Sequence, residues 1–78
     1  MKVVTTVGAW LDADRIIGFD SRPVDGCDWM ELMCKYKGKK NRISVHSLGY
    51  FTDERQAIKK IKEFFSLKEN GVQRFYFN

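Results

Sequence analysis

The sequence is poor in the residues that carry catalysis and metal binding. Among its 78 residues it has one histidine (His46), two cysteines and one proline. A nucleophile needs a base within hydrogen-bond reach, and a lone histidine near Ser44 forms no recognisable catalytic motif. One imidazole without a paired-cysteine knuckle is too few ligands for a structural metal. We therefore expect a non-enzymatic protein with no catalytic residues, no metal and no cofactor.

Long apolar runs are also missing. No stretch approaches the roughly 18 apolar residues that a membrane-spanning helix needs. The start of the chain, Met1-Lys2-Val3-Val4, lacks the apolar run and small-residue cleavage site of a signal peptide. These absences predict a cytoplasmic protein with no membrane partner, in which Cys27 and Cys34 stay reduced.

Length and charge define what is present. A chain of 78 residues predicts one domain, 1–78, whose core supplies only ~3–5 kcal/mol of net stability. Residues 1–34 contain three basic and six acidic side chains, whereas residues 35–78 contain eleven basic and four acidic ones. The net charges of −3 and +7 indicate a bipolar molecule. A cationic side attracts phosphate polymers or an acidic protein surface, although lysine runs are also common on solvated helix faces and turns.

The apolar pattern predicts strands first and a helix late in the chain. Alternation favours strands over 3–11, 15–19, 29–36, 42–46 and 72–77, with a turn at 12–14, a loop over 21–28 and a corner with a short edge strand over 48–51. Thr52 is a good helix N-cap, helical spacing runs from Ala57 to Leu67, and Asn70-Gly71 is a stop signal. We expect a single α+β domain: an antiparallel sheet of four to five strands with one helix packed on one face, in the order β-β-β-β-(β)-α-β.

The segment around the turn 37–41 is the main functional candidate. If Ile43 and Val45 share the core face with Leu32 and Cys34, the opposite face carries Lys35, Arg42, Ser44 and His46. A basic two-stranded ribbon can neutralise phosphates and fits the major groove of duplex DNA. Phe75 and Phe77 could stack on bases, but on a terminal strand of so short a chain they more often belong to the core. The candidate nucleic-acid-binding residues are Lys35, Lys37, Lys39, Lys40, Arg42, Ser44 and His46.

A series of short motifs between residues 29 and 65 carries a family resemblance. Trp29 begins a strand, a basic glycine turn follows at 37–40, Leu48-Gly49-Tyr50-Phe51-Thr52 forms a corner, and Ala57 lies on the first helical turn. This segment resembles AP2-type DNA-binding domains and the similar arm-binding domains of tyrosine recombinases. The resemblance implies a three-stranded sheet that enters the DNA major groove, with a helix behind it and contacts at the same basic residues.

A protein partner is the alternative. The chain is similar overall to small accessory proteins of phages and other mobile elements, including anti-CRISPR-type inhibitors. The acidic loop with Asp25 and Asp28, beside Trp29, and Trp10 on the first hairpin could form an interface patch, because tryptophans anchor interfaces. Both tryptophans could equally be core residues. We expect nucleic acid, DNA before RNA, ahead of an acidic or nucleic-acid-binding protein as partner, with the chain a monomer or an edge-strand homodimer.

Overall fold

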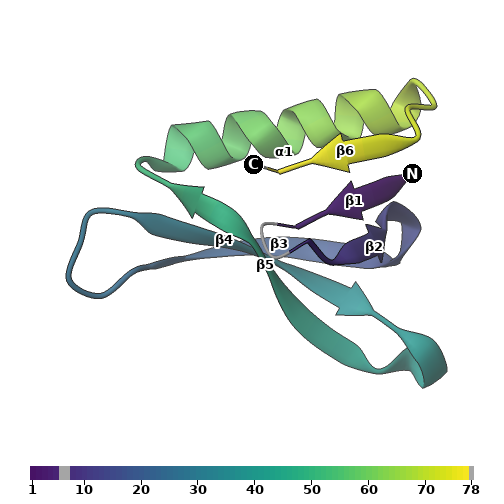
Figure 1. Ribbon diagram of the computed structural model, residues 1–78, viewed down its shortest axis with the longest axis horizontal. Helices are drawn as coiled ribbons and strands as arrows, with labels where there is room; N and C mark the ends of the chain where they lie inside the picture. Colours follow the sequence, from purple (N-terminus) through teal and green to yellow (C-terminus); the bar gives the residue numbers. More distant parts are fainter. Residues whose placement is uncertain (6–7, 78) are drawn as a thin grey trace.

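The computed structural model describes residues 1–5 and 8–77, and it is an α+β domain with one helix (Figure 1). The strands form two three-stranded sheets, in the orders β2-β1-β6 and β3-β4-β5. The expected single sheet of four to five strands is therefore wrong, whereas the fold class and the single helix are confirmed. The elements are β1 (Lys2–Val4), β2 (Trp10–Asp12), β3 (Ile16–Pro23), β4 (Met30–Lys37), β5 (Ile43–Phe51), α1 (Glu54–Glu69) and β6 (Arg74–Tyr76).

The strand predicted over 3–11 is two strands. β1 and β2 pair antiparallel, with Val3 opposite Leu11. The Thr5 amide donates to Ala9 O at 3.0 Å, and the Ala9 amide donates to Thr5 Oγ1 at 3.2 Å, while Gly8 has a φ of +80°. Glycine adopts this backbone conformation at little cost, so the chain reverses here. Thr6 and Val7, also in the predicted strand, lie outside the described residues.

Two further strand predictions change in length or partner. The strand predicted over 15–19 extends to Pro23 as β3, so the connection is 24–29 rather than the predicted loop 21–28. β3 pairs with β4 rather than with the N-terminal segment. The last strand is confirmed over Arg74–Tyr76, and it pairs in parallel with β1. Parallel neighbours need a long crossover, and the whole of the β3-β4-β5 sheet and α1 lies within it.

A bulge in β5 corrects the predicted sheet faces. Leu32 is opposite Gly49 and Met33 is opposite Ser47, so Leu48 is an extra residue and the alternation changes phase there. The expected corner at 48–51 is therefore an irregularity inside one continuous strand. Directly opposite residues share a face, and Val45 is opposite Lys35. The prediction that Ile43 and Val45 face the core is wrong, because they are 55% and 57% exposed on the face away from it.

The helix was placed correctly, with one change at its start. Asp53 is the N-cap and accepts from the Arg55 amide, while the Thr52 hydroxyl donates to Gln56 Oε1 at 3.0 Å. Asn70 closes the helix, and Gly71 follows with a φ of +74°. The Asp53 side chain and the Asn70 amide satisfy backbone groups that a helix end otherwise leaves unpaired.

An aromatic cluster joins the helix to both sheets. Phe64 of α1 is 1% exposed, and its ring centroid lies 5.6 Å from that of Phe19 on β3 and 5.7 Å from that of Phe75 on β6. Phe77 is also buried and packs on Phe75. The expectation that Phe75 and Phe77 belong to the core is thus confirmed.

Candidate nucleic-acid interface

The basic hairpin, which we define as residues 35–46, projects from the body of the molecule on the side away from α1 (Figure 1). The Gly38 amide donates to Arg42 O at 2.8 Å, and the Arg42 amide donates to Lys39 O at 3.3 Å. Lys40 and Asn41 have φ values of 58° and 60°. Asparagine tolerates this left-handed conformation, but for lysine it is unfavourable. The turn therefore holds a lysine at its tip in a strained conformation.

The hairpin carries charge of one sign. No aspartate or glutamate occurs between residues 32 and 52. Five cationic side chains are exposed to solvent on the hairpin: Lys35, Lys37, Lys39, Lys40 and Arg42. Neither of the two ion pairs in the described part of the chain, Arg22–Glu31 and Lys68–Asp14, involves one of them. No ion pair among the described residues therefore neutralises their positive charge.

Arg15 adds a sixth cation that the sequence did not indicate. Its Nη1 donates to Lys37 O at 3.3 Å, which attaches the exposed guanidinium to the base of the hairpin. Arg15, Tyr36, Gly38 and Lys39 line a hollow of ≈ 260 Å³ there. The correct pairing of β3 with β4 was the signal needed to find this residue, because Ile16 lies opposite Tyr36.

The seven candidate residues do not share one surface. Lys35 and Lys37 lie on the outer face of the sheet, and Lys39, Lys40 and Arg42 lie at or beside the turn. Ser44 and His46 lie on the other face, opposite Tyr36 and Cys34. The expectation that Ser44 and His46 line the same face as Lys35 is therefore wrong. The bulge at Leu48 shifts the register of β5, so that Ser44 and His46 lie on the inner face and Val45 lies on the outer face.

Ser44 and His46 instead interact with each other and with Tyr36. Ser44 Oγ lies 2.9 Å from His46 Nε2, and the His46 ring meets the Tyr36 ring edge-on, with centroids 5.5 Å apart. The Tyr36 hydroxyl accepts from the Asp12 amide at 3.0 Å. These contacts tie the inner side of the hairpin to the N-terminal sheet. They give His46 a packing role within the fold.

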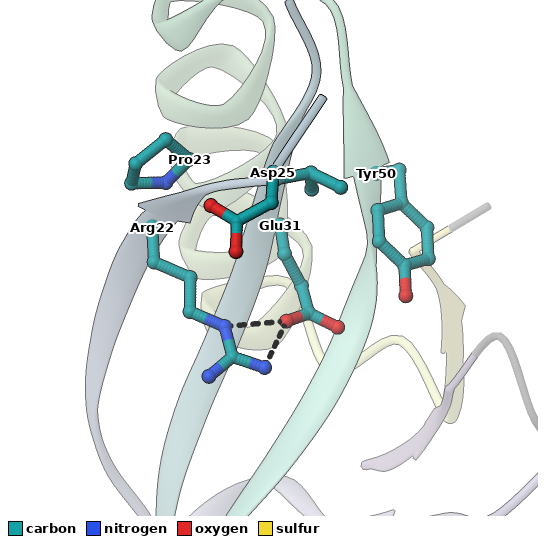
Figure 2. A pocket seen from close by; sticks show the side chains of 6 residues that line it. Arg22, Pro23, Asp25, Glu31 and Tyr50 are labelled. Atoms are coloured by element: carbon teal, nitrogen blue, oxygen red, sulfur yellow. Dashed lines mark hydrogen bonds and ion pairs between the residues drawn. The ribbon is translucent and has the colours of Figure 1, made fainter. Parts of the chain in front are cut away.

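A second hollow lies at the opposite end of the same sheet. It measures ≈ 400 Å³ and is lined by Arg22, Pro23, Val24, Asp25, Glu31 and Tyr50 (Figure 2). Glu31 is 7% exposed, and Nε and Nη2 of Arg22 both donate to its Oε1 at 2.8 Å. A buried carboxylate requires such a partner. The ion pair with Arg22 explains how Glu31 can be buried on the outer face of the central strand.

The electrostatic surroundings favour ionised Glu31. The Ser47 hydroxyl lowers the pKa of this carboxyl most, and the Arg22 guanidinium lowers it further, against the opposing effect of burial. Ser47 Oγ is buried and has no partner of good hydrogen-bond geometry within the described residues, so its effect is one of proximity. The nearby carboxylate in turn raises the pKa of the Tyr50 hydroxyl, because it favours the protonated phenol. With Glu31 paired to Arg22, the carboxylate of Asp25 leaves a net formal charge of −1 on the lining residues, and we call this site the acidic hollow.

The alternative patch is not assembled into one site. Asp25, Asp28 and Trp29 all lie in the connection between β3 and β4, and Asp25 also lines the acidic hollow. Trp10 is on β2 in the other sheet, where the Arg74 guanidinium lies 5.3 Å from its ring centroid. Trp10 and Trp29 are 53% and 47% exposed, so neither is a core residue.

Comparisons with known proteins leave the function to be argued from this geometry. No protein-family model matches the chain, and neither a curated protein nor a solved structure is significantly similar to it. Within residues 1–5 and 8–77, no helix has the length and apolar character needed to cross a membrane.

Proposed function

We propose that the protein binds nucleic acid, duplex DNA in preference to RNA, through phosphate contacts made by the basic hairpin. The observation that carries the proposal is the projecting turn with five exposed cations and no acidic residue between positions 32 and 52. A two-stranded ribbon has the width to enter the major groove, and lysine and arginine neutralise phosphates. The strained backbone of Lys40 supports the same function, since unfavourable conformations often persist where a side chain serves binding.

The outer face of the sheet limits what the hairpin can recognise. Next to Lys35 and Lys37, the part of this face at the hairpin carries Ile43 and Val45, which offer few hydrogen bonds to base edges, and Asp20 lies on the same face opposite Met33. Binding is then governed by backbone phosphates and depends little on base sequence. The resemblance of residues 29–65 to AP2-type domains also supports DNA as the partner, since it implies a sheet of three strands followed by a helix.

The salt dependence of binding tests the proposal quantitatively. If all five hairpin cations contact phosphates, the slope of log K against log salt is about −4.5 for duplex DNA. A fourfold increase in salt then weakens binding roughly 500-fold. The measurement is a fluorescence-anisotropy titration of random-sequence duplex DNA, with single-stranded DNA and duplex RNA run in parallel, at several salt concentrations.

Two double charge reversals separate the hairpin from general positive charge. Lys39→Glu/Lys40→Glu removes two phosphate contacts, so the salt slope decreases in magnitude by about two. Lys59→Glu/Lys62→Glu changes the net charge equally on two exposed residues of α1 and leaves the slope unchanged. Equal losses in the two variants, or no binding by the unaltered protein at low salt, would refute the proposal.

Exposure of the tryptophans favours a second candidate, a protein-binding adaptor or inhibitor of the kind found in mobile elements. Trp29 is half exposed beside the acidic connection that contains Asp25 and Asp28. Large exposed aromatic side chains are typical anchors of protein interfaces. Loss of a co-purifying protein in Trp29→Ala, but not in Trp10→Ala, would support this function and assign it to the β3–β4 connection.

A further inference from the structure

The four outer strands of the two sheets differ in how their free edges are protected. Natural proteins protect sheet edges with short strands, charged side chains, proline and bulges. β2 and β6 have three residues each, which is too short to pair extensively. β3 carries Asp20, Arg22 and Pro23, and it has a register irregularity between Ile16 and Gly18. Each of these three edges has at least one protective feature over most of its length.

β5 is the exception among the described strands. It has nine residues, Ile43–Phe51, with neither a charged residue nor a proline among them. Its bulge at Leu48 lies in the second half, so the first five residues form a regular edge. No described element pairs with that outer edge, and Figure 1 shows it free along the hairpin. Ile43 and Val45, both more than half exposed, lie within this regular segment.

We propose that β5 pairs antiparallel with β5 of a second copy of this chain, which joins two β3-β4-β5 sheets into one sheet of six strands. The bulge confines regular pairing to Ile43–Ser47, and a two-fold axis places the middle residue of that segment opposite itself. The middle residue is Val45. Ile43 of each copy then lies opposite Ser47 of the other, and the two exposed Val45 side chains cover one another.

Charge complementarity favours the antiparallel arrangement, and it favours a second copy of this chain as the molecule that pairs with the free edge of β5. In this arrangement the basic turn of each copy extends beyond the paired segment towards the far end of the partner's β5, where Tyr50 lines the hollow that also contains Asp25, Glu31 and Arg22 and has a net formal charge of −1. The basic turn of each copy thus meets the acidic hollow of its partner, and the contact occurs twice because of the symmetry. A parallel arrangement would place the two basic turns side by side and is opposed by like-charge repulsion.

The contact is small, which determines its strength. A five-residue ladder with one pair of opposed valines buries less surface than the ~1,200–2,000 Å² of a stable complex. We therefore expect a dissociation constant in the micromolar range or weaker. The inference does not rest on the proposed nucleic-acid binding, because the edge, the valine and the hollow are independent of any phosphate contact.

Sedimentation velocity over a concentration series, without nucleic acid, tests the dimer. The unaltered chain is expected to shift from 9.2 kDa towards twice that mass as its concentration rises to hundreds of micromolar. Val45→Lys places two lysines opposite each other at the axis and should weaken association at least tenfold. Ile17→Lys is the matched control, since Ile17 is 54% exposed on the protected β3 strand and should leave association unchanged.

A crosslink keeps the test informative if the lysine variant does not fold. Directly opposite residues of an antiparallel pair have Cβ atoms ~4.5–5.5 Å apart, close to the distance that a disulfide spans. In a Cys27→Ser background, which removes the exposed native thiol, Val45→Cys should form an intermolecular disulfide on mild oxidation faster than Ile17→Cys. A monomer at every concentration, equal crosslinking of the two variants, or a dimer insensitive to Val45→Lys would each overturn the proposal.

Discussion

Replacement of Phe64 by alanine tests how the two sheets are held together. The Phe64 ring is 1% exposed, and its centroid lies 5.6 to 5.8 Å from those of Phe19, Phe75 and Phe77. These neighbours come from both sheets and from the residue after β6. The two sheets share no strand, so this cluster is a principal link between them. Removal of the ring should therefore destabilise the whole domain rather than fray the helix.

The size of the effect follows from the burial. Truncation of a buried phenylalanine costs about 3–5 kcal/mol. A domain of this length has a total free energy of unfolding of roughly 4–12 kcal/mol. Phe64→Ala is therefore expected to remove between about a quarter of the stability and all of it. Phe65 is adjacent but 49% exposed, and Phe65→Ala should cost about 1 kcal/mol.

Urea unfolding, followed by far-UV circular dichroism and by tryptophan fluorescence, measures both variants. The two signals should change together, since a cluster shared by both sheets implies one cooperative transition. If Phe64→Ala is unfolded without urea, Phe64→Leu retains enough volume to give a number. A cost for Phe64→Leu no larger than that for Phe65→Leu, or separate transitions for the two signals, would refute this account of the core.

Three further predictions concern single groups. Lys40→Asn should raise the free energy of unfolding by about 0.5–1 kcal/mol, because asparagine tolerates a φ of 58° better than lysine; a loss of stability in urea titrations would contradict the turn geometry. The pKa of Glu31 is lowered on folding, so its contribution is present above the unfolded value and lost as pH falls through the folded one. The stability difference between the unaltered protein and Glu31→Gln should therefore shrink below pH 4.5, and a difference independent of pH would exclude the ion pair with Arg22. Burial raises the pKa of the Cys34 thiol from 9.0 to about 11. The buried neutral thiol therefore contributes to stability below pH 9, and this contribution is lost towards pH 11. A thiol reagent at pH 8 should modify Cys27 alone, and rapid reaction of two thiols in the folded protein would show that Cys34 is accessible.

Local signals in the sequence were sufficient for the helix and for the basic turn. The spacing of Ala57 and Phe64, an acidic residue at the helix start and Gly71 after its end act within a few residues of one another, so no long-range information was needed. The same holds for the hairpin cations, since adjacent strands joined by a short turn bring them together by themselves. The helix and the basic turn are therefore the parts of the fold and site that could be predicted from the sequence.

The predictions that proved wrong concern segments whose apolar alternation fits two different structures. Alternation over 3–11 fits one strand or two strands around a turn, and only the contacts of Thr5 with Ala9 and the backbone of Gly8 decide for the turn. A bulge at Leu48 inverts which side of β5 faces the core without altering the alternation on either side of it. The placements of Val45, Ser44 and Arg15 all depended on register, which a single sequence does not contain.

The topology converts a charge asymmetry along the chain into a separation in space. β4 belongs to both hairpins of its sheet, so the acidic connection at 24–29 and the basic turn at 38–42 lie at its two ends. Eight residues of extended strand place them about 27 Å apart, well beyond the ~8–10 Å over which salt leaves exposed charges interacting. The acidic connection is therefore too distant to neutralise the basic turn, and neither ion pair among the described residues involves that turn. Under the two proposals above, a phosphate backbone or the acidic hollow of a second copy would supply an anionic partner, and because both would use the basic turn, excess duplex DNA should compete with dimer formation.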